Sequence, residues 1–441
     1  MNRKGMLVLC LMLLALSLIS VVVLTGCGSG SDDTTTTAAQ TETTVAAGGD
    51  TTTTAGATTD TTVSGTVSFD GEIVVGALAS ITGANAMTGA EMKWAYEQAV
   101  KDINANGGVD VAGKKMELKL KFVDDKSDAT EGAAAVEKLI KVEKTNLILS
   151  SNITPINLAA GIVAEKYNSY YQIATSWTDF IAAQNFQWVS DVFFTPTDAA
   201  SVPFNVADLQ PEADRPKNWA VMTWDNQDGQ GLGEGVKAVA AQHGYDLVDY
   251  EAYTPGTKDF SSIILKMKQK NVDAVVALLF AADAITFVKQ MKEQEFAPKF
   301  IFGWAGTWPT EFMKALGKDS DYVGHDGFWS EDNGYPGSKE LGQKFKDEHD
   351  GLDSVSIGLS YASVQVLAQA IEQAGSTDAA AVRDAVFGGT FPGTTMGDIK
   401  YDEKGIANVP PVGLWWKDGA RVMFWPDAGN TFEWFVPWDQ R

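Results

Sequence analysis

The sequence predicts an α/β protein with two lobes, each built around a doubly wound parallel sheet. Short apolar runs alternate with helical patterns from about residue 72 to residue 303, as expected for parallel strands joined by crossover helices. A second run of the same kind begins after residues 193–198, which indicates a second sheet. The 441 residues are also enough for two domains.

The first run begins with a buried strand at Glu72–Leu78 and a helix from about Gly89. Further strands are predicted at 116–124, 147–149 and 170–173, and further helices at 129–142 and 155–167. After the strand Leu147–Leu149 come Ser150, Ser151 and Asn152, where a serine or asparagine is expected to cap the next helix, with Pro155 in its first turn. Such a turn directs backbone N–H groups and a positive helix end at whatever lies above the strand.

The second run predicts strands at 219–224, 245–253, 272–280 and 299–303, and helices at 229–242, 260–270 and 284–294. An extended segment at 323–330 and helices at 338–348 and 356–375 follow. Two doubly wound lobes place a cleft between their strand tips, which is the usual ligand position for open α/β sheets.

The N-terminus predicts a signal peptide at residues 1–26, because Arg3 and Lys4 precede an apolar run. The run is also long enough for a transmembrane helix. The stretch Leu24-Thr25-Gly26-Cys27 resembles the bacterial lipobox, which implies cleavage before Cys27, lipidation of that cysteine and an extracytoplasmic protein anchored to the membrane. The alternative is a free cysteine in an uncleaved anchor. Residues 27–70 are rich in Thr, Ala, Gly and Ser and are expected to form a disordered tether.

Composition excludes several classes of protein. The formal net charge of −23 argues against nucleic acid as a partner. The other cysteine, Cys10, lies in the leader, so no disulfide is expected. His243, His325 and His349 lack metal-ligand spacing, and no glycine-rich stretch has the full context of a phosphate or dinucleotide site. We therefore expect no metal and no cofactor.

Five short motifs follow one another along the folded region: Ser80-Ile-Thr-Gly83, Asp102-Ile-Asn-Ala-Asn-Gly-Gly108, Val123-Asp-Asp125, Lys258-Asp-Phe-Ser261 and Tyr401-Asp-Glu-Lys-Gly405. Through them the chain resembles the leucine/isoleucine/valine-binding family of periplasmic-type binding proteins, the solute receptors of ABC importers. This resemblance implies two lobes joined by three hinge crossings. Lobe one is then expected at 71–192 and 330–394, and lobe two at 193–329 and 395–441.

The resemblance also implies a monomeric receptor that binds a small molecule and delivers it to a membrane permease driven by ATPase subunits. A sensor of the same fold that signals to another protein is the alternative. A hydrolase is not favoured and no catalytic residue is expected, because no Ser or Asp in the candidate turns has a histidine in a neighbouring turn. The expected ligand is a branched-chain or other amino acid, or a related amide or organic acid.

In this family, lobe-one turns hold the ligand carboxylate through hydroxyl and backbone N–H groups. The matching candidates are Ser150, Ser151, Asn152, Ser176, Thr178, Trp177 and Thr88. Trp177 either stacks on the ligand or packs at the lobe edge, and Thr88 is expected near the cleft mouth. Neither turn contains Lys or Arg, which favours recognition by backbone dipoles.

Lobe two departs from the family pattern. Members that bind amino acids place an acid at the strand tip matching residues 303–306, and here that position is Ala305. A buried ammonium without a counter-charge costs several kcal/mol, so either another acid supplies the charge or the ligand carries no ammonium. Asp283 is the nearest substitute, although helix N-cap is its expected role. Phe280, Trp304 and Trp308 indicate either an aromatic wall or core packing.

Overall fold

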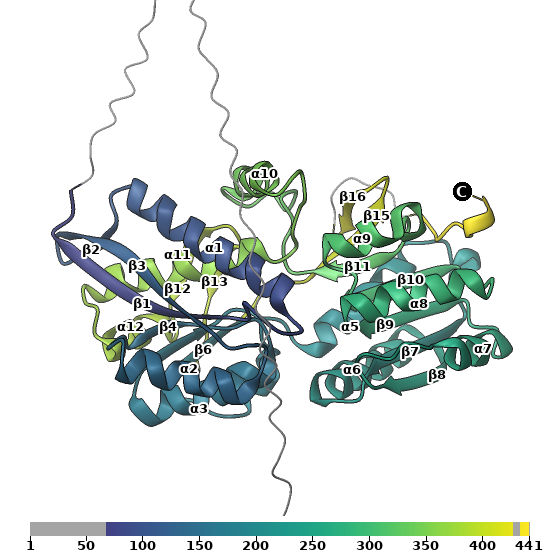
Figure 1. Ribbon diagram of the computed structural model, residues 1–441, viewed down its shortest axis with the longest axis horizontal. Helices are drawn as coiled ribbons and strands as arrows, with labels where there is room; N and C mark the ends of the chain where they lie inside the picture. The colour runs from purple at the N-terminus through teal and green to yellow at the C-terminus, as the bar shows by residue number, and fades with distance from the viewer. Residues whose placement is uncertain (1–67, 427–432, 441) are drawn as a thin grey trace, which may run out of the picture. The chain divides into compact units, whose positions relative to one another are not determined.

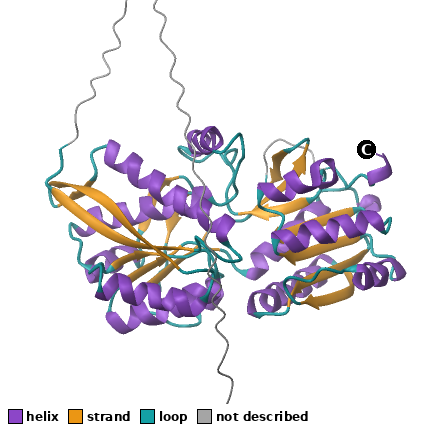
Figure 2. Ribbon diagram, viewed as in Figure 1, coloured by secondary structure: helices purple, strands orange, loops and turns teal. Residues whose placement is uncertain are grey.

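Two seven-stranded sheets organise the described part of the chain, residues 68–426 and 433–440, in a computed structural model (Figure 1). The first sheet has the order β14-β6-β5-β4-β1-β3-β2 and the second β16-β15-β11-β10-β9-β7-β8. Helices lie on both sides of each sheet (Figure 2). The predicted α/β class with two parallel-sheet lobes is confirmed.

The first sheet contains β1 (Gly71–Ala79), β2 (Val109–Val111), β3 (Lys114–Asp124), β4 (Leu147–Leu149), β5 (Tyr170–Ile173), β6 (Val189–Phe193) and β14 (Ile406–Asn408). All pairs are parallel except β2 with β3. The helices of this lobe are α1 (Ala86–Ala105), α2 (Ala129–Lys141), α3 (Thr154–Tyr167), α4 (Thr178–Ala182), α10 (Ser338–Glu348), α11 (Ile357–Ala374) and α12 (Ala379–Val386). A separate hairpin is formed by β12 (Thr390–Thr394) and β13 (Gly397–Lys400).

Successive side chains of β4 and β5 in the first sheet pack in two different hydrophobic clusters, one on each face. Ile148 and Tyr171 pack in the cluster that contains the buried residues of α2 and α3. Leu147, Leu149 and Tyr170 belong instead to the cluster that contains α1 and α11. Strand β4 is therefore apolar throughout, because helices cover both faces of the sheet at this strand.

The second sheet contains β7 (Asn218–Trp224), β8 (Asp246–Tyr253), β9 (Ala274–Leu279), β10 (Phe300–Ala305), β11 (Gly324–Gly327), β15 (Val412–Lys417) and β16 (Ala420–Trp425). Strands β7 to β11 pair in parallel, whereas β15 is antiparallel to β11 and to β16. The helices are α5 (Pro196–Asp208), α6 (Gln227–His243), α7 (Ser261–Gln269), α8 (Ala281–Glu293) and α9 (Thr310–Leu316). Helix α5 packs on α6, and α8 contacts both α7 and α9.

The chain crosses between the lobes after β6, after β11 and after β14, which agrees with three crossings. The predicted boundary of the last crossing, at residue 395, is wrong. Residues Ile406–Asn408 pair with Asp191–Phe193 in the first sheet, so the third crossing lies between Asn408 and Val412. Strand β14 has three residues, too few for an alternation pattern to reveal it.

The predicted leader, Cys27 and nearly all of the tether lie outside the described residues. In the residues that are described, we find no helix that is both long and apolar enough to span a membrane.

Candidate ligand-binding site

A cavity of about 540 Å³ lies where strands of both sheets end. Its wall in lobe one comes from the segments that follow β1, β4, β5 and β6, and its wall in lobe two from those that follow β7 to β11. The lining includes Thr88, Asn152, Ile153, Thr154, Thr175, Trp177, Phe193, Trp224, Asp228, Lys258, Phe280, Asp283, Ala305, Trp308 and Phe328. This is the position expected for a ligand in open α/β sheets.

The first lobe-one turn reaches the cavity through Asn152 and not through the serines before it. The Ser150 hydroxyl donates to the Ser151 carbonyl at 2.9 Å and accepts from the Ala174 N–H at 3.1 Å. The Ser151 hydroxyl donates to Asp125 at 2.5 Å. Both serines are buried and lie outside the cavity lining, so they support the turn from behind.

Helix α3 begins at Thr154 with Ile153 as N-cap, so the expected serine or asparagine cap is wrong, whereas Pro155 does lie in the first turn. The serine hydroxyls before the helix are engaged elsewhere, since that of Ser150 donates to the Ser151 carbonyl and that of Ser151 donates to Asp125. Asn152, Ile153 and Thr154 still place the positive end of α3 at the cavity wall. An anionic or polar ligand group would be favoured there.

In the second lobe-one turn, residues 175–178, some side chains likewise line the cavity and others lie behind it. The Ser176 hydroxyl accepts a hydrogen bond from the Asn157 side chain at 3.0 Å, and the Thr178 hydroxyl donates to Asn408 on β14 at 2.8 Å. Both side chains are buried outside the lining. Thr175 and Trp177 line the cavity instead, and Thr88 lies in the wall formed by the start of α1.

Aromatic rings form much of the wall. Trp177, Phe193 and Phe328 follow one another at ring-centroid distances of 5.7 and 5.3 Å, and Trp308 continues the series 5.5 Å from Phe328. These rings give the cavity a broad apolar surface. The sequence missed Phe193 and Phe328 because each ends or follows a strand and reads equally well as core.

A second pair of rings, Trp224 and Phe280, is stacked at 4.2 Å on the lobe-two side. Phe280 was among the predicted residues and lines the cavity, as does Ala305. Trp304 does not: it is 1% exposed, and its indole donates to the Ala199 carbonyl at 3.3 Å in the core. It still belongs to β10, whereas Trp308 lies beyond the strand tip.

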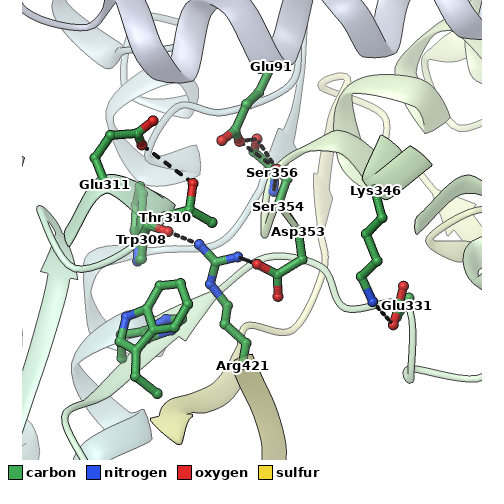
Figure 3. Close-up of polar contacts among 12 residues, drawn as sticks. Glu91, Trp308, Thr310, Glu311, Glu331, Lys346, Asp353, Ser354, Ser356 and Arg421 are labelled. Carbon is green, nitrogen blue, oxygen red and sulfur yellow. Dashed lines mark hydrogen bonds and ion pairs between the residues drawn. The ribbon is translucent and has the colours of Figure 1, made fainter. Parts of the chain in front are cut away.

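Trp308 is held in place from behind by Arg421, a residue of β16 (Figure 3). The guanidinium donates to the Trp308 carbonyl and pairs with Asp353. The Trp308 indole donates to Asp326 at 2.8 Å. In the same region, Glu91 of α1 accepts hydrogen bonds from two serines before α11 (Figure 3). Arg421 thus links Trp308 of lobe two to Asp353 of lobe one.

Asp283 lines the cavity but is already engaged by lobe two. One carboxylate oxygen accepts from the Tyr253 hydroxyl at 3.2 Å and from the Gly256 N–H at 2.9 Å. The N-cap of α8 is Phe280, so the expected capping role of Asp283 is wrong. Its carboxylate instead binds the loop after β8 to the start of α8.

A second acid, Asp228, was missed by the sequence reading. It lies in the first turn of α6, is 8% exposed and lines the cavity. A Cβ at Gly229 would lie 2.0 Å from the Trp224 carbonyl oxygen, so glycine lets this turn pack on the tip of β7. Burial raises the pKa of Asp228 to about 6, and a hydrogen bond from Trp177 opposes the rise. The sequence did offer one signal for Asp228, because this acid comes four residues after the end of the buried strand β7.

The raised pKa makes stability depend on pH. The folded protein holds the Asp228 proton more tightly than the unfolded chain, where the pKa is 3.8, so stability falls as the pH rises between about 4 and 6. At pH 7 we expect Asp228→Asn to be more stable than the unmodified protein by on the order of 2 kcal/mol. Urea unfolding from pH 4 to pH 8 should show this gain shrinking toward pH 4, and a gain independent of pH would contradict it.

The chain belongs to the periplasmic binding protein family, whose model matches residues 72–412. It is 26% identical over 353 residues to Leu/Ile/Val-binding protein homolog 3 of Brucella melitensis biotype 1, an alignment covering 80% of this chain and 93% of that protein. The family resemblance inferred from the sequence is therefore confirmed.

Two solved structures share the fold. The branched-chain amino acid transporter substrate binding protein LivJ from Streptococcus pneumoniae, in complex with isoleucine, superposes with a TM-score of 0.69 at 20% identity, covering 80% of this chain and 99% of that chain. An ABC transporter solute binding protein from Rhodopseudomonas palustris BisB5, in complex with 3,4-dihydroxybenzoic acid, gives 0.67 at 20% identity, covering 84% and 100%.

Proposed function

We propose that the protein is the extracytoplasmic solute receptor of an ABC importer, which takes up a small molecule between its lobes and delivers it to a permease driven by ATPase subunits. The observation that carries this proposal is the cavity of about 540 Å³ built at the strand tips of both sheets. A volume in this range suits a ligand of the size of an amino acid or an aromatic acid. Membership of the periplasmic binding protein family supports the same conclusion.

The chemistry of the wall favours a ligand with an apolar body and one polar end. Phe193, Trp308 and Phe328 offer flat apolar surface. Asn152 and Thr175, with the start of α3, offer hydrogen bonds and a positive dipole end. An amino acid or amide with a large apolar side chain, or a related organic acid, matches this arrangement.

The predicted lipidation of Cys27 would hold the receptor at the membrane, with residues 27–70 as the tether. We propose that it acts there as a monomer, since one chain supplies both walls of the cavity.

Ligand-dependent thermal stabilisation tests the proposal. The purified protein is expected to melt at a higher temperature with at least one member of a panel of apolar amino acids, their amides and aromatic acids, because a ligand that binds only the folded state stabilises it. Trp308→Ala should reduce the shift. Trp304→Phe, a conservative change in the core outside the cavity, should retain it. A panel in which no compound raises the melting temperature would contradict the receptor function.

A further inference from the structure

We infer that Asn157 is a positioning residue of lobe one, which couples the two turns at the cavity wall, so that ligand affinity depends on a side chain that the ligand does not touch. The two turns are residues 150–152 after β4 and residues 175–178 after β5. Asn157 lies on α3, is fully buried and does not belong to the cavity lining. The inference rests on the proposed function and specifies how the lobe-one wall is held.

The amide of Asn157 forms hydrogen bonds with both turns. Its Oδ1 accepts from the Ser151 N–H at 3.1 Å, and its Nδ2 donates to the Ser151 carbonyl at 3.0 Å and to the Ser176 hydroxyl at 3.0 Å. Oδ1 also accepts from the Tyr171 hydroxyl at 2.5 Å. These partners fix the orientation of the amide, because a backbone N–H faces Oδ1 and a backbone carbonyl faces Nδ2. Three of the four bonds therefore go to the two turns.

Asn157 interrupts an otherwise apolar face of α3. Thr154, at the start of the helix, lines the cavity. The other buried residues of the helix are apolar: Ile156, Ala160, Gly161 and Ala164. Asparagine is a weaker helix former than alanine or leucine, and burying an amide is costly unless its hydrogen bonds are made. An apolar side chain would suit packing better at this position, so the amide indicates a role beyond packing.

The direct bonds between the two turns restrain them less firmly. The Thr175 hydroxyl donates to the Ser151 carbonyl at 3.3 Å, and the Ser150 hydroxyl accepts from the Ala174 N–H at 3.1 Å. Each of these bonds depends on a hydroxyl group, which rotates about its C–O bond. Asn157 instead presents a planar amide from a helical backbone, where its own N–H donates to the Ile153 carbonyl at 3.1 Å.

The cavity residues of both turns lie next to the bonds that Asn157 makes. Asn152 directly follows the residue that is bound through its N–H and its carbonyl. Thr175 and Trp177 flank the bound Ser176. A wall that is already ordered loses less conformational entropy when a molecule binds to it, which raises affinity. Removing the amide should therefore weaken binding without removing any contact with the bound molecule.

Two single hydrogen bonds to the same amide provide the test. Ser176→Ala removes the bond to the second turn, whereas Tyr171→Phe removes a bond that involves neither turn. Tyr171→Phe is the matched control, since both side chains are fully buried. The purified full chain is titrated by calorimetry with L-isoleucine, L-phenylalanine and 3,4-dihydroxybenzoate. We expect Ser176→Ala to weaken the binding of a bound probe about fivefold, and Tyr171→Phe to lower the melting temperature while retaining the affinity.

A double variant separates positioning from direct contact. Asn157→Ala should weaken binding about tenfold or more, because it frees both turns. Ser176→Ala added to Asn157→Ala should cause no further loss of affinity, since the Ser176 hydroxyl acts through the amide. A serine that touched the bound molecule itself would add its own loss, and additive losses would overturn the inference.

Hydrogen exchange in the absence of any probe measures the coupling itself. In Asn157→Ala the backbone amides of both turns are expected to exchange about tenfold or more faster. Ser176→Ala, the milder change, should speed exchange in residues 175–178 and keeps the test decisive if Asn157→Ala does not fold. Faster exchange confined to residues 150–152 in Asn157→Ala, or equal loss of affinity in Ser176→Ala and Tyr171→Phe, would overturn the inference and leave the receptor function intact. If the unmodified protein bound none of the three probes, the receptor function would be overturned, and exchange would still decide whether Asn157 couples the turns.

Discussion

Asp125→Ala is expected to lower the free energy of unfolding by about 3–5 kcal/mol, because a buried carboxylate that accepts several hydrogen bonds leaves every donor unpaired when it is removed. Asp125 is fully buried. It accepts from the Ser80 hydroxyl at 2.7 Å, the Ser151 hydroxyl at 2.5 Å and the Ser127 N–H at 2.8 Å. It therefore joins the ends of β1, β3 and β4.

The measurement is the urea midpoint of the variant beside that of Asp128→Ala. Asp128 is three residues away, but its carboxylate caps α2 at the surface, so its loss should cost only about 1 kcal/mol. Ligand binding should also weaken in Asp125→Ala, because Ser151 supports the turn that carries Asn152 to the cavity. If Asp125→Ala and Asp128→Ala lost the same free energy of unfolding, the three hydrogen bonds that Asp125 accepts would contribute little to stability.

Arg421→Met is expected to destabilise the protein by about 3 kcal/mol and to weaken ligand binding as well. The side chain of Arg421 is 2% exposed and that of Asp353 is 26% exposed, and removing one partner of a partly buried ion pair leaves the other with less compensation. Its guanidinium also stacks 4.2 Å from the ring of Trp416 and binds the Trp308 carbonyl. Methionine retains part of the packing volume, so the loss should come mainly from charge and hydrogen bonding.

Lys237→Met is a suitable comparison, since Lys237 and Glu234 form an exposed pair that should contribute below about 1 kcal/mol. Urea unfolding gives the stability, and titration with a ligand found by the thermal panel gives the affinity. The combination expected for Arg421→Met is a large loss of stability together with weaker binding. A variant that unfolds early yet binds normally would separate Arg421 from the positioning of Trp308.

The order of strands and helices could be predicted because most parallel strands are short apolar runs and most crossover helices have apolar residues at helical spacing. The segments that were missed lack such a pattern. Helix α5 contains Pro203 in its interior, which argues against a helix in a sequence reading. Strand β14 has three residues, and β14 and β15 pair with strands that are distant in the chain. Their partners cannot be inferred from local sequence.

The predicted site residues divide into two groups. Those in the cavity wall are Thr88, Asn152, Trp177, Phe280, Asp283 and Ala305, and those outside the lining are Ser150, Ser151, Ser176, Thr178 and Trp304. Ligand binding by any of them stays a prediction. The Ser150 N–H donates to the Gln172 carbonyl at 3.1 Å, so this residue continues the sheet and its side chain stays inside. The chain turns toward the cavity only at Asn152. Asp228 and Arg421 were missed for another reason, since their importance arises from Trp177 and Trp308, which are far from them in sequence.

Trp177 and Asp228 line the same cavity from the two lobes, and this gives the protein a built-in optical reporter. The indole belongs to lobe one and the carboxylate to lobe two, and indole fluorescence responds to a nearby charge. A ligand that fills the cavity would change the surroundings of this one indole. The difference in emission between the unmodified protein and Trp177→Phe would then follow occupancy directly, without any attached dye.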